Sequence, residues 1–431
     1  MVKFITLGKF DNKYKYVIFY ILTMLPLEYF LGDNFPDEMK IKYLRREYFP
    51  STVFVYEIFK YLGILIVGLI ISRFETESFF PANNPSDIEK KESSTDVELI
   101  LEEKEILLPN YSSLSISIII CIFVIELKSS ELFYLVGLYG LDFWMIEIIF
   151  IAIINIFLFK IKIYIHQKLA ISIILIFSTL MKILSIISVY NSGGYRIYFE
   201  YSWLIIIGIL GFLLFFFADA YVLCKMKWFF DLKFISVKRM LISFGFFGII
   251  VFFISSMISH FVECQTSTFS SVICYVYDEE NSSKYVDNFK IFFKNIWMED
   301  RNAFVNLIYI LILLLKILLS GFHYFFAFLI VKILSPEYLV CSDSILYFIM
   351  KIITLIYYLA TNNVTTDFVF DFLSQIFSIL GTIIYLELIE LNFCGLNHDV
   401  KKNINIRAKT ESSKILRNYS DEQSIAEFIR N

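Results

Sequence analysis

Residues 303–332 read AFVNLIYILILLLKILLSGFHYFFAFLIVK, an apolar run interrupted near its middle by Lys316 and again by His323. A transmembrane helix needs about 20 mostly apolar residues, because the hydrocarbon core of a bilayer is about 30 Å thick. Lipid admits only helices or closed barrels, and this run lacks the alternation of polar and apolar residues found in barrel strands. The run therefore predicts a membrane-spanning α-helix.

Runs of the same kind recur along most of the chain. They cover residues 16–31, 53–72, 113–137, 140–159, 167–188, 202–224, 238–261, 338–360 and 367–391. The composition agrees, with 58% hydrophobic, 19% aromatic and 19% charged residues and a mean hydropathy of +0.68. We expect an all-α polytopic integral membrane protein of about ten transmembrane helices. Run 113–137, interrupted by Glu126, Lys128 and Glu131, could instead form a short helix with a re-entrant piece.

The placement of Lys and Arg in the short loops predicts cytoplasmic N- and C-termini. The basic loops after the fourth and sixth spans then face the cytoplasm, whereas the basic loop before Tyr48 is an exception. The chain divides into a cytoplasmic N-terminus (1–15), two spans (16–73), an acidic cytoplasmic loop (74–112), spans three to five (113–188), spans six to ten (202–391) with a lumenal loop (262–302), and a cytoplasmic tail (392–431). Within the lumenal loop, Cys264 and Cys274 could form a disulfide and Asn281 begins a glycosylation sequon, or both features could be chance.

Motifs of catalysis are missing from the sequence: it has no nucleophile elbow, P-loop, HExxH or CxxC, and its four histidines are scattered. We therefore expect no enzyme, no cofactor and no metal site. The net charge of −4 does not suggest a nucleic-acid partner.

Ionisable residues inside the predicted spans are the main functional signal, because they are costly in lipid and commonly mark a substrate or ion pathway. Glu57 and Lys60, at i and i+3, can pair on one face of the second span or snorkel near its end. In the fourth and fifth spans, Asp142 or Glu147 could neutralise Lys182.

The eighth and ninth spans carry Lys316, His323 and Lys351. His323 follows Lys316 by two helical turns and shares its face. Lys351 lies too deep to snorkel and should face the interior, either to bind an anionic group or to form a structural pair. Acidic and amide groups near the ends of the last two spans are expected in hydrated positions: Asp343, Asp371, Gln375, Glu387 and Glu390. Gly208 with Gly211, and Gly245 with Gly248, could allow close helix contact or could simply add flexibility.

Ten spans divide into two halves of five, and an odd repeat must be inverted in the membrane, as in many transporters. Several stretches resemble the drug/metabolite transporter superfamily, in particular its nucleotide-sugar-transporter branch. The stretches are Val55 to Lys60 in the second span, Phe143 to Ile187 with its basic turn, Lys227 to Gly248, and Leu334-Ser335-Pro336.

This resemblance implies a ten-helix inverted-repeat fold and a solute carrier working by alternating access in an endomembrane such as the Golgi or ER. We expect a nucleotide sugar or another anionic metabolite as cargo, the lipid bilayer as a partner, and a homodimer as an option. The alternative is a non-transporting scaffold that acts through its acidic loop and tail. A plasma-membrane or vacuolar location also stays open.

Overall fold

The structure is a computed structural model of the chain. It describes residues 5–7, 14–31, 53–74, 119–120, 146–159, 163–191, 202–232, 235–260, 276–278, 283–285, 293, 303–361 and 364–391. Most of the predicted acidic loop, the lumenal loop and the tail lies outside these ranges, as does almost all of predicted span 113–137.

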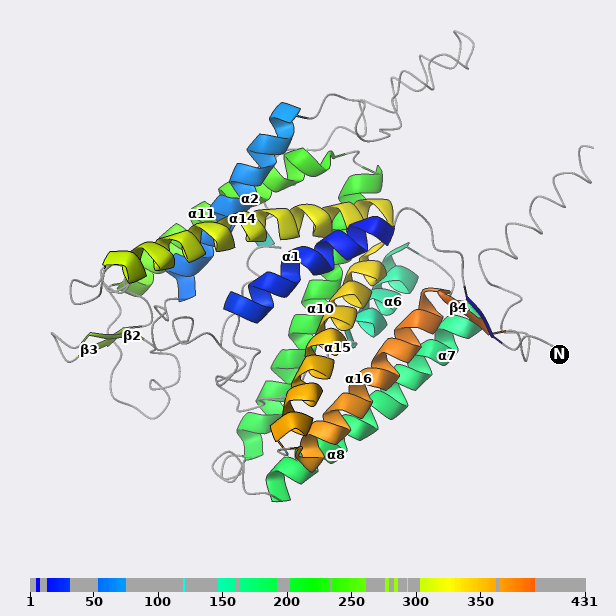
Figure 1. Ribbon diagram of the computed structural model, residues 1–431. Helices are drawn as coiled ribbons and strands as arrows, with labels where there is room; N and C mark the ends of the chain where they lie inside the picture. The colour runs from blue at the N-terminus through cyan, green and yellow to red at the C-terminus, as the bar shows by residue number, and fades with distance from the viewer. Residues whose placement is uncertain are drawn as a thin grey trace, which may run out of the picture.

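The described chain is almost entirely helical (Figure 1). Its helices are α1 (Lys15–Leu31), α2 (Val53–Phe74), α6 (Ile146–Phe159), α7 (Ile165–Ile173), α8 (Thr179–Asn191), α10 (Ser202–Leu232), α11 (Val237–His260), α14 (Ala303–Ile333), α15 (Pro336–Thr361) and α16 (Thr366–Tyr385), with the π-helical segment η4 (Ile174–Ser178) joining α7 to α8. Short strands form two antiparallel pairs, β1 (Ile5–Leu7) with β4 (Ile389–Leu391) and β2 (Val276–Asp278) with β3 (Ser283–Tyr285).

Within the described residues, 5 helical stretches are long and apolar enough to cross a membrane. They are Ile165–Ser185, Val237–Ile258, Asn306–Ile333, Pro336–Thr361 and Thr366–Tyr385. Shorter apolar helices occur at Lys15–Pro26 and Ile146–Phe157. The prediction of a helical membrane protein is thus confirmed at this level, and the count of ten spans stays a prediction.

Helix α2 packs closely against both α11 and α14, and the three run together in Figure 1. A Cβ atom at Gly248 of α11 would lie 2.1 Å from the Tyr61 ring, and one at Gly245 would lie 2.6 Å from the Leu65 nitrogen. Along α2 the contacting residues run from Tyr61 to Leu65, while along α11 they run backwards from Gly248 to Gly245. The two helices are therefore antiparallel. Because small residues let helix backbones approach each other in lipid, the predicted role of Gly245 and Gly248 is confirmed.

Helix α16 lies along the continuous rod of α7, η4 and α8 (Figure 1). The buried Ser178 hydroxyl is 2.9 Å from that of Ser374 and 2.6 Å from that of Ser378. Further along, a Cβ atom at Gly381 would meet the Ile174 side chain at 2.5 Å. Small side chains and interhelical hydroxyl bonds are typical adhesive contacts between membrane helices.

The β1–β4 pair brings the segment before α1 next to the segment after α16. We call this end of the bundle the strand end. The Tyr14 hydroxyl, beside α1, also lies 3.4 Å from that of Tyr338, in the first turn of α15. The two ends of the described chain therefore lie next to each other.

The last predicted span, 367–391, ends earlier than expected. Helix α16 stops at Tyr385, and Glu387 has a φ of 59°, in the left-handed region that a right-handed helix excludes. The apolar residues of Ile389–Leu391 then form strand β4 instead of another helical turn.

Candidate functional site

A charged pair lies at the crossing of α2 and α14. The Lys60 ammonium is 2.7 Å from the Glu57 carboxylate, as their i, i+3 spacing predicted. The same ammonium lies 5.6 Å from the centre of the Tyr61 ring and 5.7 Å from that of Tyr324 on α14. Cation–π contacts stabilise a desolvated cation, so α14 contributes to holding Lys60 inside the bundle.

Lys60 also borders a small crevice between α2 and α14. Six residues line it: Phe59, Lys60, Leu313, Lys316, Ile317 and Ser320. The space in the crevice is about that of one water molecule, far below the roughly 300 Å³ at which pockets for drug-sized ligands begin. Two lysines and a serine hydroxyl on its wall suit a small anionic group.

The close approach of the two helices shapes this crevice. A Cβ atom at Gly63 would lie 1.9 Å from the Ile317 carbonyl oxygen, and one at Gly321 would lie 2.4 Å from the Gly63 carbonyl oxygen. Neither position has room for a larger residue at the present helix separation. Helix α14 continues unbroken through Gly321 to Ile333.

A second polar group joins α1, α14 and α15. The buried Tyr20 of α1 donates its hydroxyl hydrogen to the Asp343 carboxylate of α15 at 2.5 Å. The Tyr20 ring lies against the His323 ring, with centres 4.4 Å apart. His323 in turn contacts Tyr324 edge-on at 5.5 Å. Tyr324 therefore links this group to Lys60.

These contacts form a continuous series of polar side chains from Lys60 through His323 to Asp343. At a rise of about 1.5 Å per residue, Lys60 lies about 21 Å from the Phe74 end of its helix, His323 about 15 Å from the Ile333 end and Asp343 about 10 Å from the Pro336 end. These polar groups therefore lie within the apolar helices and not in their terminal turns. Groups placed in this way mark a pathway or a structural pair.

Lys351 lies apart from this chain. Its ammonium is 2.5 Å from the Asp371 carboxylate of α16 and 5.9 Å from the centre of the Phe368 ring. The depth of Lys351 in its span predicted that it faces the interior, either to bind an anionic group or to form a structural pair. The contact with Asp371 is a pair of the second kind. The sequence reading missed Asp371, which was expected in a hydrated position.

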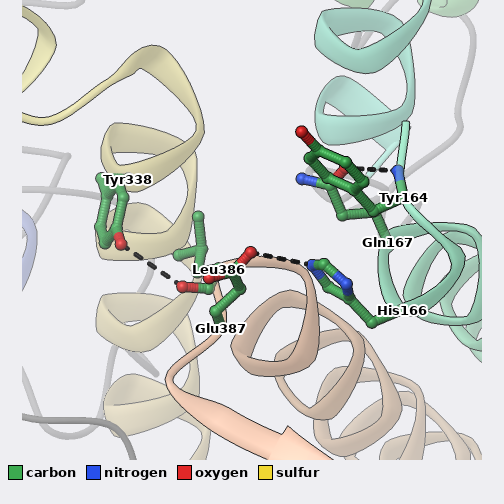
Figure 2. Close-up of polar contacts among 6 residues, drawn as sticks. All are labelled: Tyr164, His166, Gln167, Tyr338, Leu386 and Glu387. Atoms are coloured by element: carbon green, nitrogen blue, oxygen red, sulfur yellow. Dashed lines mark hydrogen bonds and ion pairs between the residues drawn. The ribbon is translucent and has the colours of Figure 1, made fainter. Parts of the chain in front are cut away.

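Polar contacts also close the strand end (Figure 2). His166 Nε2 of α7 is 3.1 Å from the Glu387 carboxylate, and the His166 side chain is only 4% exposed. The Tyr338 hydroxyl donates to the Leu386 carbonyl oxygen at 3.4 Å. These contacts tie α7 and α15 to the turn that follows α16, next to the β1–β4 pair.

One further carboxylate, that of Glu337, is buried near this end. The Asn155 amide of α6 donates to the Glu337 carboxylate at 2.8 Å. The Cys224 thiol of α10 lies 3.9 Å from the Asn155 side-chain oxygen. Glu147, one of the predicted site residues, is buried at 3% exposure on α6. The inner walls of α6, α10 and α15 are thus polar in part.

The structure brings together Glu57, Lys60, Lys316 and His323 from the predicted set and leaves Glu147 and Lys351 elsewhere. The Lys182 side chain, Asp142, Cys264, Cys274 and Asn281 lie outside the described residues. The contact between Asp343 and Tyr20 was missed because the two residues, 323 positions apart, meet only through the fold. Their one sequence signal was an acidic residue seven positions into an apolar span.

No family model, curated protein or solved structure matches this chain. Its function therefore has to be argued from the residues themselves. Within the part of the chain that the structure describes, no group of three or more His, Cys, Asp or Glu side chains could hold a metal ion.

Proposed function

We propose that the chain is a membrane solute transporter that works by alternating access and binds an anionic solute between α2 and α14. One observation carries the proposal: ionisable side chains from α1, α2, α14 and α15 meet inside a bundle of apolar helices. Such groups are expensive in lipid, and a transport pathway is a common reason for their presence.

We further propose ten spans arranged as two inverted halves of five. Predicted span 113–137 is then the third, α7 to α8 the fifth, and α10 the first of the second half. A twofold axis in the membrane plane pairs α1 with α10, α2 with α11, α6 with α15, and α8 with α16.

The helix contacts support this pairing. Helix α2 packs against its counterpart α11, and α8 packs against its counterpart α16. The contact of α1 with α15 is matched by the contact of α10 with α6, as exchange of the halves requires. The two self-paired contacts are antiparallel, because Tyr61 meets Gly248 and Ser185 bonds to the Asp367 carbonyl oxygen.

The number of membrane crossings between α2 and α6 supports the ten-span proposal separately. If α2 ends on the strand side and α6 also ends there at Phe159, then α6 begins on the opposite side. The chain between Phe74 and Ile146 must then cross an odd number of times. One crossing at 113–137 satisfies this condition and completes ten.

The cargo proposal is based on charge and size. Lys60 and Lys316 border the crevice, and Ser320 adds a hydroxyl donor. The crevice holds about one water molecule, so any anion would have to widen the gap between α2 and α14, and a phosphate or carboxylate group would widen it less than a nucleotide sugar. We therefore propose small anionic metabolites first and nucleotide sugars second.

Ligand-induced stabilisation of the purified full chain tests this proposal. A ligand that binds only the folded state at 100 times its Kd stabilises it by about 2.7 kcal/mol. The probes are inorganic phosphate, succinate and a uridine diphosphate sugar, measured as shifts in Tm. The proposal predicts a shift with at least one probe, lost in Lys60→Met and Lys316→Met and retained in Lys168→Met, whose side chain is exposed on α7. Equal shifts in all four proteins, or none in the wild type, would count against it.

A non-transporting scaffold remains the competing proposal. Its support is that Lys60, Lys351 and His166 each have a carboxylate partner in the fold. A scaffold predicts that Lys60→Met leaves the cellular phenotype intact, whereas deletion of residues 75–112 abolishes it. A transporter predicts the reverse.

A further inference from the structure

Asp343 is a carboxylate in the interior of α15, two turns from the helix start. It accepts a 2.5 Å hydrogen bond from Tyr20 on α1. Helix α1 packs on α14 and α15, so this bond lies at the contact of three helices. A short bond from a neutral hydroxyl to a carboxylate is strengthened by the charge of the acceptor.

The charges around Asp343 determine what can neutralise it. Helix α14 contributes His323, whose ring is against Tyr20, and helix α2 contributes Lys60, whose charge acts on His323 from beyond Tyr324. On α15 itself, Cys341 and Tyr347 are the titratable neighbours.

The other helices packed on α15 carry titratable groups with contacts of their own. Helix α16 carries Asp371, which pairs with Lys351, and Tyr385, which lies near Glu337. Helix α6 carries Glu147, and α10 carries Cys224 beside Asn155. Tyr20 is the group that donates the 2.5 Å hydrogen bond to Asp343.

We propose that Asp343 is a proton-binding site, and that its hydrogen bond with Tyr20 couples proton uptake to the contact between α1 and α15. The inference goes beyond the proposed transport function, since it assigns a coupling ion, and its role in transport rests on that function. The bond is strong when Asp343 is ionised and weak when Asp343 is neutral. Protonation therefore weakens the α1–α15 contact but not the α10–α6 contact that the proposed symmetry relates to it. Alternating access requires such a difference between the two halves.

The step is a simple proton transfer. A hydronium ion from the strand-end solvent gives one proton to a carboxylate oxygen of Asp343, which becomes a neutral carboxyl group, and water is left. Tyr20 keeps its own hydroxyl hydrogen throughout. At about 10 Å from the end of α15, Asp343 is within reach of water entering from that side. Release on the opposite side would complete one coupled cycle.

Infrared spectroscopy of the full chain in lipid vesicles tests the site without any cargo. A protonated carboxyl group has a C=O band separate from that of a carboxylate, and a pH titration follows it. The wild type should show a titrating carboxyl band that is absent in Asp343→Asn. The matched control Asp367→Asn, in the first turn of α16, should keep the band. Identical difference spectra in wild type and Asp343→Asn would overturn the proposal.

Tyr20→Phe keeps the test decisive if Asp343→Asn does not fold. Loss of the hydrogen bond to the ionised form should let the carboxyl band persist to higher pH, by about one pH unit. An unchanged titration would also overturn the proposal. Anion binding is read separately from the Tm shifts above, so a titrating Asp343 without anion binding would reject the transport function and retain the proton site.

Discussion

The close crossing of α2 and α14 makes Gly63→Ala the most informative single substitution. A Cβ atom at Gly63 would lie 1.9 Å from the Ile317 carbonyl oxygen, against an ordinary contact of about 3.4 Å. The shortfall is therefore about 1.5 Å, the difference between these two distances. A backbone oxygen cannot rotate away, so the helices must separate. Overpacking of this kind costs about 1–3 kcal/mol, and the Lys60 contact with Tyr324 should lengthen with the helix separation.

The assay is thermal unfolding of the purified chain in detergent, with Gly68→Ala as the matched control. A Cβ atom at Gly68 would lie 3.1 Å from Ile242 Cγ1 and Leu241 Cβ and 3.2 Å from the Ile242 backbone nitrogen. Relief of these contacts needs a shift of only a few tenths of an ångström, so the control should lose much less stability than Gly63→Ala. Equal Tm values for Gly63→Ala, Gly68→Ala and wild type would refute the reasoning, because the α2–α14 contact would then not be as close as described.

Three other substitutions test separate contacts by the same unfolding assay. Asp371→Asn should lower the free energy of unfolding by about 1–2 kcal/mol, less than for a fully buried ion pair, because the Lys351 side chain is 27% exposed. The double variant Lys351→Met/Asp371→Leu should recover most of this stability. Failure to recover it would show that the two residues do not pair. Glu387→Gly should be about 1 kcal/mol more stable than Glu387→Ala, because both lose the His166 contact but only glycine adopts a φ of 59° without strain; equal stability would contradict the left-handed turn. Ser178→Ala should cost about 1 kcal/mol through its lost bonds to α16, whereas Ser172→Ala, exposed one turn before η4, should cost little.

Local patterns in the sequence predicted the helices well, because a long apolar run has few structural options in lipid. Glu57 and Lys60 were also predictable as a pair, since three residues on a helix fix their proximity. The same holds for Gly245 and Gly248, whose spacing exposes one smooth helix face.

Contacts between distant elements were less accessible. The sequence placed Asp343 and Asp371 near helix ends and predicted hydrated positions, but Tyr20 and Lys351 approach them from other helices. Neither partner can be identified without knowing which helices are neighbours. The early end of α16 was missed for a related reason: Ile389–Leu391 is apolar enough to extend a helix, but it pairs instead with β1, which lies at the other end of the chain.

Uptake into proteoliposomes tests the central claim most directly. The purified full chain is reconstituted in vesicles preloaded with phosphate, succinate or a uridine diphosphate sugar, and exchange of the labelled solute is measured beside Lys60→Met and Lys168→Met. The account predicts exchange above that of empty vesicles for at least one anion, abolished by Lys60→Met and unchanged by Lys168→Met. Exchange no greater than in empty vesicles for every anion, or exchange insensitive to Lys60→Met, would contradict it.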